Sequence, residues 1–399
     1  MANGGGVVAA SALLGWLLLA IAYGIPDSFV QAHIDESRVL IDEEGTYPSS
    51  YSTAIQYDNY TVRIMLNIVD WEDGNPFATA LSSANYARYW HGYAIVLRLL
   101  FCFVSIEGMR RLFQFAFLTL LVLVSILLAR RWGRRGVICA IALTTSYFAF
   151  EAQDAVASLP FFPSLFLSLV GALVVVQMKT VSERKISLLF VALGAWTAYF
   201  DFLDTPVLTF VVPASLFLVK SWFAGRKSSA VAFLLNCAGW LFGYGGMWAS
   251  KWVLASVFLG VDVIGDALNQ AAIRTGQTSV EGSSQSLISG LIGNVNAAGS
   301  AGIVIMIVLA VAIVLLILRW RREGLDSTSL TALALLMCAM VPYIWYVVLS
   351  NHSSIHWWFT YRNQIGSLLA AEMSIIVLLA DTVRSRVVVR GRGDGRHAR

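Results

Sequence analysis

The sequence predicts an all-α polytopic membrane protein, and three observations support this prediction. First, 58% of the 399 residues are hydrophobic and 13% are charged, whereas about a quarter of the residues in a soluble domain are charged. Second, apolar runs such as AGIVIMIVLAVAIVLLIL, residues 301–318, approach the roughly 20 residues that a helix needs to cross the hydrocarbon. Third, alternating apolar and polar strand patterns are absent. Because unpaired backbone is not tolerated in lipid, these runs are predicted to be helices.

Hydropathy and charge together predict ten membrane-spanning helices in a single membrane domain, residues 1–399. The predicted spans cover residues 7–25, 111–130, 136–151, 160–178, 186–200, 206–220, 229–247, 299–318, 328–349 and 364–381. The first lacks the basic start and the cleavage site of a signal peptide, so we expect it to remain as a span. The four cysteines lie inside apolar runs without paired spacing, which predicts buried thiols rather than a metal or disulfide role.

Basic residues predict the orientation of the chain. With both termini cytoplasmic, the inner loops contain RRWGRR, KTVSERK, KSWFAGRK and RWRR, and residues 382–399 form a basic cytoplasmic tail. This assignment gives the cytoplasmic loops the excess of Lys and Arg that they normally carry. The apolar stretch 92–108 has Arg98 in its middle. If it crossed the membrane, every later basic loop would face outward, so we expect an interfacial or re-entrant helix there.

Two long segments are predicted on the outer side of the membrane. Residues 26–110 form the first, with interfacial helices, and residues 248–298 form the second. Loops of this length are usually functional or disordered. The second contains TGQTSVEGSSQS, which we expect to be mobile, and the glycine-rich GYGG before it is expected to interrupt the seventh helix ahead of Lys251.

Acidic residues of the first outer segment are the candidate catalytic bases. Asp35 and Glu36 lie in HIDESR, and Asp58 lies in QYDNYT. A carboxylate pressed against apolar surface has its charged form disfavoured, which raises its pKa toward a value useful in general-base chemistry. Alternatively, these are ordinary interfacial acids. Other polar and aromatic residues of the outer side are candidates for substrate binding: Asn59, Tyr60, Trp90, Asp154, Asp201, Trp357 and Tyr361.

Cations and histidines are predicted to gather on the same side, where they could bind the phosphate of a donor. These candidates are Arg88, His91, Arg98, Lys251, His352, His356 and Arg362. The forked guanidinium of arginine matches phosphate oxygens. The alternatives are an aromatic belt with snorkelling cations and, for SNHSSIHWWFTYRN at residues 350–363, a structural cap on the helices. His352 and His356 could share a metal, but two ligands are weak evidence. No cofactor is therefore predicted, and a divalent metal stays an open alternative.

A first span, a large outer loop containing acids, and about ten spans with outward polar groups resemble the C-type (GT-C) integral membrane glycosyltransferases. In that superfamily the first outer loop carries an Asp/Glu pair that acts as base or orients the acceptor, and Asp35-Glu36 matches it. The wider pattern looks like bacterial membrane proteins found with surface-polysaccharide genes. The resemblance implies a sugar on a polyprenyl phosphate, a glycan or glycolipid acceptor, and an active site on the outer face of the bacterial cytoplasmic membrane. It implies membrane lipids as partners and no nucleic acid.

Three other functions would use similar residues. A lipid-linked saccharide polymerase or ligase also joins sugars at an outer loop, and would consume repeat units. A flippase or transporter would form no bond, and should carry polar residues through the spans to the cytoplasmic side. A purely structural protein would tolerate alanine at Asp35, Glu36 and Asp58.

Overall fold

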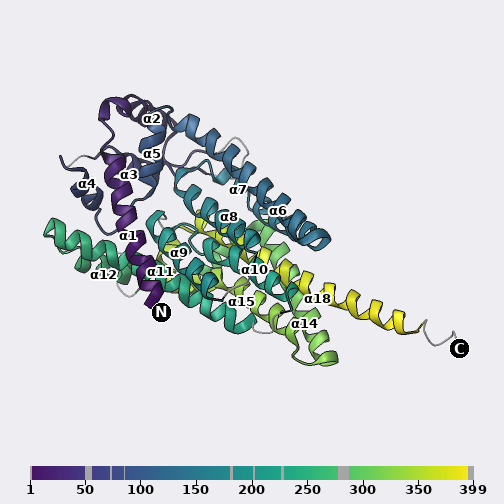
Figure 1. Ribbon diagram of the computed structural model, residues 1–399. Helices are drawn as coiled ribbons and strands as arrows, with labels where there is room; N and C mark the ends of the chain where they lie inside the picture. Colours follow the sequence, from purple (N-terminus) through teal and green to yellow (C-terminus); the bar gives the residue numbers. More distant parts are fainter. Residues whose placement is uncertain are drawn as a thin grey trace.

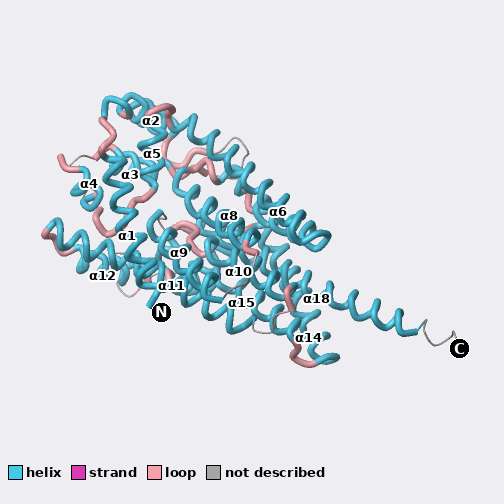
Figure 2. The backbone as a smooth tube through the Cα atoms, viewed as in Figure 1, coloured by secondary structure: helices cyan, strands magenta, loops and turns pink. Residues whose placement is uncertain are grey.

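The computed structural model describes residues 2–49, 56–71, 74–84, 86–179, 183–200, 203–225, 229–276 and 287–393, with side chains as far as residue 380. All regular secondary structure in these residues is helical, as Figure 2 shows. Seven helices are long and apolar enough to cross a membrane. They confirm the all-α class and the polytopic membrane architecture.

The observed helices follow the predicted spans closely. Their bounds are α1 (Ala2–Tyr23), α6 (Ile106–Ala149), α8 (Phe162–Gln177), α9 (Glu183–Phe200), α10 (Leu208–Phe223), α11 (Ser229–Leu259), α14 (Gly299–Glu323), α15 (Ser327–Val348) and α18 (Gln364–Gly393). The two predicted spans at 186–200 and 206–220 form α9 and α10, which are not among the seven long apolar helices. The spans predicted at 111–130 and 136–151 lie together in α6.

Helix α6 is a hairpin of two arms. Gly133 interrupts it with φ 62° and ψ −142°, a backbone conformation that glycine adopts without steric cost. Ser125 Oγ and Thr144 Oγ1 lie 3.2 Å apart, although a straight helix would separate these residues by roughly 28 Å. The two arms are therefore antiparallel, and their bounds match the two predicted spans.

The glycine-rich stretch of α11 packs against α9 instead of ending the helix. A Cβ atom on Gly243 would lie 2.0 Å from the carbonyl oxygen of Val191, and one on Gly194 would lie 2.0 Å from that of Trp240. Small residues allow such close approach of two backbones in membrane helices. The structure differs here from the expected break, because α11 continues to Leu259 and Lys251 lies inside it.

The first long segment folds as a cap of short helices beside the end of α1. These are α2 (Gln31–Glu44), α3 (Asn59–Val69), α4 (Pro76–Ser82) and α5 (Tyr93–Phe101), which gather at the upper left of Figure 1. At nine residues, α5 is about 14 Å long and too short to cross the hydrocarbon. This agrees with the expectation that residues 92–108 do not form a span.

Four more short helices pack at the end of the molecule where the cap lies. They are α12 (Val263–Arg274), α13 (Leu287–Ala297), α16 (Ser350–Ile355) and α17 (Trp357–Thr360). Asp266 of α12 pairs with Arg88, Trp358 of α17 packs on Tyr47, and α13 packs against α16 and α17. The end of α18 projects in the opposite direction (Figure 1). Most of the TGQTSVEGSSQS stretch, residues 277–286, and the last six residues of the basic tail lie outside the described residues.

Candidate functional site

Arg98 is a structural centre of the cap. Its side chain is fully buried, and its Nε and Nη1 donate to the carbonyl oxygens of Ala22 and Val69 at 2.9 and 2.7 Å. Nη2 donates to the carbonyl oxygen of Ile25 at 2.7 Å and to Asp27 at 3.1 Å. All three nitrogens therefore have protein acceptors. This use of the guanidinium differs from the predicted binding of a donor phosphate.

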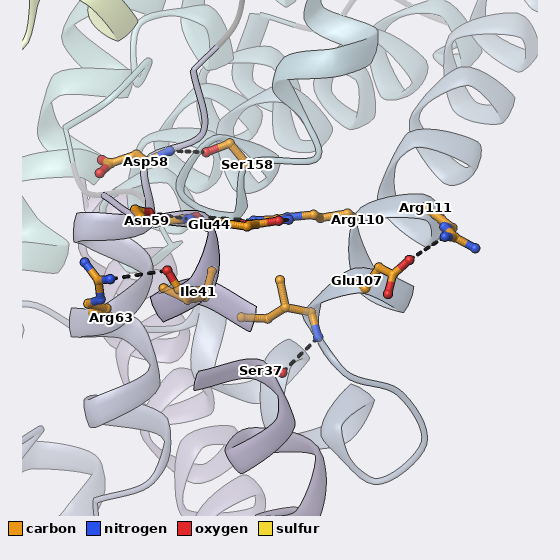
Figure 3. Close-up of polar contacts among 12 residues, drawn as sticks. Ser37, Ile41, Glu44, Asp58, Asn59, Arg63, Glu107, Arg110, Arg111 and Ser158 are labelled. Atoms are coloured by element: carbon orange, nitrogen blue, oxygen red, sulfur yellow. Dashed lines mark hydrogen bonds and ion pairs between the residues drawn. The ribbon is translucent and has the colours of Figure 1, made fainter. Parts of the chain in front are cut away.

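A second buried arginine joins the cap to α6 (Figure 3). Arg110 donates from both terminal nitrogens to the carboxylate of Glu44, at 2.5 and 2.8 Å, and from Nη2 to Asn59 Oδ1 at 3.2 Å. Burial alone would raise the pKa of Glu44, but Arg110 and Asn59 hold it below its usual value. The bidentate pair of Arg110 and Glu44 fixes geometry as well as charge. Asn59 accepts a hydrogen bond from the same arginine, so its role is to hold the cap against α6.

Asp58 is the N-cap of α3. Its Oδ1 accepts from the Thr61 amide at 3.0 Å and its Oδ2 from the Thr61 hydroxyl at 2.5 Å. Burial raises the pKa of Asp58, and the two hydrogen bonds from Thr61 offset this only in part. The pKa of Asp58 is therefore raised, as the sequence predicted. Both of its carboxylate oxygens, however, accept hydrogen bonds at the N-terminus of α3, as is usual for an aspartate at the N-cap position.

The other two predicted bases lie on the surface of α2. Asp35 accepts a hydrogen bond from Gln31 at 3.0 Å, and its carboxylate is 3.6 Å from Arg38. Glu36 is also exposed. Neither carboxylate is pressed against apolar surface, which was the physical reason for proposing them. Tyr60, a predicted substrate contact, is likewise exposed.

The stretch YARYWHGY forms an aromatic and cationic cluster with α11 and α12. The Arg88 guanidinium lies 4.0 Å from the ring centre of Tyr86 and 2.9 Å from the Asp266 carboxylate. Arg274, in the last turn of α12, lies 5.7 Å from the ring centre of Tyr89. The cavity between the two arginines measures about 20 Å³, which is room for about one water. This cluster is closed to a phosphate in the present conformation.

Lys251 and Trp90 complete this cluster as buried packing residues. Lys251 Nζ donates to the carbonyl oxygens of Ala80 and Leu81, both at 2.9 Å, and lies 5.3 Å from the ring centre of Trp90. Trp90 donates to the Met247 carbonyl at 2.7 Å. The Lys251 amino group therefore satisfies two carbonyl oxygens at the C-terminal end of α4.

Of the predicted histidines, His91 and His352 are buried and His356 is half-buried, and the pKa of each lies below its usual value. His91 Nδ1 is 3.0 Å from the Tyr93 hydroxyl, and burial lowers its pKa to about 3. His352 Nδ1 is 3.2 Å from Arg274 Nη1, and burial followed by the charges of His356 and Arg274 lowers its pKa. Burial and Arg274 also lower the pKa of His356 to about 4. The sequence therefore places two neutral imidazoles beside a permanent cation.

These histidines predict that acid destabilises the protein. These histidines have a lower pKa in the folded protein than in the unfolded chain, where the pKa is about 6.5. Each therefore contributes its full stabilisation above about pH 6.5, and this stabilisation is lost as the pH falls below that value. Between pH 7 and 5 the loss is about 2 kcal/mol for each such histidine. We expect the melting temperature in detergent to fall less between pH 7 and 5 in H352Q/H356Q than in the wild type. Equal falls in the two proteins would contradict the assignment.

Arg362 lies in a buried position with unused hydrogen-bond donors. It is 1% exposed, and its Nε and Nη1 have no acceptor among the described residues. Its guanidinium is 5.1 Å from the ring centre of Phe161 and 4.8 Å from that of Tyr361, and the carboxylates of Glu151 and Asp204 act on it electrostatically. A buried charge without hydrogen-bond acceptors is costly, so a ligand that supplies acceptors would be favoured here.

Four helices, α5, α6, α8 and α9, form an apolar groove. It has a volume of about 450 Å³. Ten residues from α5, α6, α8 and α9 line it: Val96, Leu100, Leu112, Phe113, Ala116, Phe162, Pro163, Phe166, Leu167 and Phe200. All ten are apolar, and Phe162 directly follows Phe161, the residue whose ring faces Arg362. The groove therefore has the character of a site for a hydrocarbon chain. Arg362 does not line it, and the two are connected through the neighbouring residues Phe161 and Phe162.

Backbone strain also marks this region. Glu151 has φ 51° and Leu203, the residue before Asp204, has φ 75°. Left-handed backbone costs a residue other than glycine roughly 1–2 kcal/mol, and such strain clusters at functional sites. The Leu203 carbonyl lies 3.2 Å from His352 Nε2, and the Asp204 carbonyl accepts from Asn363 Nδ2 at 3.3 Å. The same strained turn therefore contacts His352 and the residue that follows Arg362.

The cap and the 350–363 segment meet at this end of the molecule. The Tyr47 and Trp358 rings lie 4.9 Å apart, and the charge of Asp58 acts on Tyr47. Trp358 packs on Phe359 at 4.6 Å, which in turn packs on His356 at 4.9 Å. Asp58 and the histidine pair therefore lie on the same side, linked by a short series of aromatic contacts.

The remaining predicted contacts have mixed placements. Asp154 accepts hydrogen bonds from Gln114 at 3.3 Å and from Gln153 at 3.1 Å. Trp357 is 45% exposed, and its side chain packs beside Gly293 of α13. Asp201 lies outside the described residues.

Sequence reasoning missed Arg110, Glu44 and Arg274. Arg110 and Glu44 are 66 residues apart, and no local pattern connects them. Arg274 falls in the segment that was expected to be a loop. The sequence signal that could have located Arg274 is the helical pattern of VIGDALNQAAIR, residues 263–274. Asp262 precedes this stretch and caps the start of α12, where its carboxylate accepts from the Gly265 amide at 2.7 Å.

No group of three or more His, Cys, Asp or Glu side chains that could hold a metal ion occurs in the described part of the chain. The comparisons give no relative to guide the assignment, because no protein-family model, no curated protein and no solved structure matches this chain.

Proposed function

We propose that this protein is a GT-C-like integral membrane glycosyltransferase of bacteria. It would move a sugar from a polyprenyl-phosphate donor to a hydroxyl of a glycan or glycolipid acceptor on the extracytoplasmic face, in a bundle of ten spans with cytoplasmic termini. The proposal is supported best by two neighbouring features: a groove of about 450 Å³ whose described lining residues are all apolar, and a buried arginine with two N–H groups that have no acceptor among the described residues. The arginine contacts Phe161, the residue before Phe162 of the groove. A polyprenyl phosphate would fit both features, because its chain is a hydrocarbon and its phosphate supplies hydrogen-bond acceptors.

In this proposal each residue near Arg362 has a defined task. The prenyl chain occupies the groove, and Arg362 Nε and Nη1 donate to the phosphate oxygens. The acceptor hydroxyl attacks the anomeric carbon while the bond from that carbon to the phosphate oxygen breaks, and the electron pair leaves with the phosphate. The hydroxyl proton passes to a carboxylate, and the arginine stabilises the charge that develops on the leaving group.

We assign the base to Glu151 rather than to Asp58. Glu151 acts electrostatically on Arg362 and is half-buried, whereas both oxygens of Asp58 accept from Thr61. Asp35 and Glu36 stand exposed on α2 and retain at most a role in orienting the acceptor. His352 connects Arg274 to the Leu203 carbonyl, one residue before Asp204.

Filling the groove tests the proposal. We expect A116W to weaken the binding of undecaprenyl phosphate to the purified protein at least tenfold, since Ala116 lines the groove and a tryptophan would fill part of it. The matched control is T119W, because Thr119 is exposed on the same arm of α6 and does not line the groove. Binding is measured as the rise in melting temperature with ligand concentration. Equal affinities of A116W and T119W would contradict the assignment of the groove.

The products separate the alternatives. A transferase releases undecaprenyl phosphate from undecaprenyl-phosphate sugars when an acceptor is present. A polymerase consumes lipid-linked repeat units, and a flippase binds the lipid and releases nothing. Binding without release from any sugar donor in a panel would therefore favour a flippase over the proposed transferase.

A further inference from the structure

A second cavity lies at the opposite end of the helices and has a different chemical character. Its volume is about 450 Å³. It is lined by the turn of the α6 hairpin and by the ends of α8 and α10, through Arg131, Trp132, Arg135, Val176, Met178, Lys179, Lys220, Phe223 and Ala224. Helix α10 begins at Leu208, four residues after Asp204, and its last turn lines this cavity. The proposed transfer site and the cavity therefore lie towards its two ends.

The charge of the cavity has one sign. Four of its nine lining residues are Lys or Arg, and none is acidic. Arg135 and Lys179 are exposed and have no hydrogen-bond acceptor or acid within ion-pair distance among the described residues. The Arg135 guanidinium lies 5.1 Å from the ring centre of Phe223, which orients it at the cavity wall. Four cations and no acid among the described lining residues favour binding of an anion.

The negative end of α8 is already neutralised within the protein. Lys220 Nζ donates to the carbonyl oxygens of Val175 and Met178, both at 2.5 Å, and Arg131 Nη1 donates to that of Gln177 at 3.0 Å. These are among the C-terminal carbonyls that a helix leaves unpaired, and they carry its partial negative charge. Because Lys220 and Arg131 cover them, they do not repel an anion. The other donors of Arg131, together with Arg135 and Lys179, remain for a ligand.

The walls also include apolar and aromatic side chains. Trp132 and Phe223 pack edge to face at 5.6 Å, beside Val176 and Met178. Aromatic rings and cations at the ends of membrane helices are typical of the headgroup region, and basic pockets between helices bind the phosphates of anionic lipids. We propose that this pocket binds a phosphate-ester anion, namely the headgroup of an anionic phospholipid. This inference does not depend on the proposed transferase activity.

The arginines of the hairpin turn provide a charge-matched test. R131Q/R135Q removes two lining cations, whereas R130Q/R134Q removes two exposed cations from the same turn that do not line the pocket. The full-length protein in detergent is titrated with dioleoylphosphatidylglycerol, with dioleoylphosphatidylcholine and with sodium phosphate, and the melting temperature is recorded. We expect phosphatidylglycerol to stabilise the wild type and R130Q/R134Q alike, with phosphatidylcholine much weaker. Its half-saturating concentration should rise at least tenfold in R131Q/R135Q.

The sodium phosphate titration identifies the source of the anion. If inorganic phosphate stabilises the protein and this effect needs Arg131 and Arg135 while phosphatidylglycerol has none, the site exists but takes a soluble phosphate. If the two double variants respond identically to both probes, binding reflects the general charge of the turn and the proposed pocket is overturned. Both variants alter exposed side chains, so folded protein is expected in each case.

Discussion

Replacing Arg98 with methionine is expected to leave little folded protein. The substitution removes every hydrogen bond to the carbonyl oxygens of Ala22, Ile25 and Val69, and methionine has no donor to replace them. Breaking a buried charged network in this way costs about 3–5 kcal/mol, which is a large part of the stability of a domain. The measurement is the yield of monodisperse protein by size-exclusion chromatography and, where protein is recovered, its melting temperature.

An exposed arginine provides the control for Arg98. Arg111 forms an ion pair with Glu107 across one helical turn, with 78% of its side chain exposed, and such surface pairs contribute little. We expect R111M to behave as the wild type in both measurements. Wild-type yield and melting temperature in R98M would show that the cap does not depend on this arginine.

Hydropathy and charge were sufficient to predict the long apolar helices, but not the short helices of the cap, the path of α11 or the partners of the buried polar groups. The helix bounds follow from apolar runs, because each helix must satisfy its own backbone in lipid. The two arms of α6 were predicted because RRWGRR separates two such runs. The path of α11 was not predicted, because glycines that allow close helix packing and glycines that end a helix look alike in the sequence. Only the contact of Gly243 with Val191 distinguishes them.

The candidate site was predicted in part for the same reason. Arg98 and Arg362 are both arginines in aromatic, apolar surroundings, and the sequence suggested the same role for each. The two arginines differ in their hydrogen-bond acceptors. Segments distant in the sequence supply carbonyl oxygens to Arg98, whereas Nε and Nη1 of Arg362 have no acceptor among the described residues. The exposed positions of Asp35 and Glu36 likewise depend on how α2 packs in the cap. The residue types indicated at which end of the molecule the candidate site lies. They did not indicate which side chains have hydrogen-bond donors without acceptors.

Replacing Arg362 with methionine is expected to abolish the proposed transfer while leaving the protein folded. Because two of its N–H groups have no acceptor among the described residues, their removal breaks no hydrogen bond and relieves the cost of burying a charge with unsatisfied donors. This gain offsets the lost attraction to Glu151 and Asp204. We therefore expect a melting temperature within a few degrees of the wild type. Loss of a donor that stabilises developing charge lowers kcat by about 10²–10³-fold, measured as release of undecaprenyl phosphate from its sugar conjugates.

The comparison of R362M with R98M and R362K makes this prediction specific. A purely structural arginine would behave like Arg98, so loss of folded protein in R362M would contradict a role in binding. Lysine keeps the charge but not the planar pair of donors, so R362K should fold and regain only part of the activity. If R362M turns over at the wild-type rate, Arg362 does not hold the donor phosphate. If instead R362M is stable and inactive while A116W binds undecaprenyl phosphate normally, the phosphate is held by Arg362 and the prenyl chain lies outside the groove.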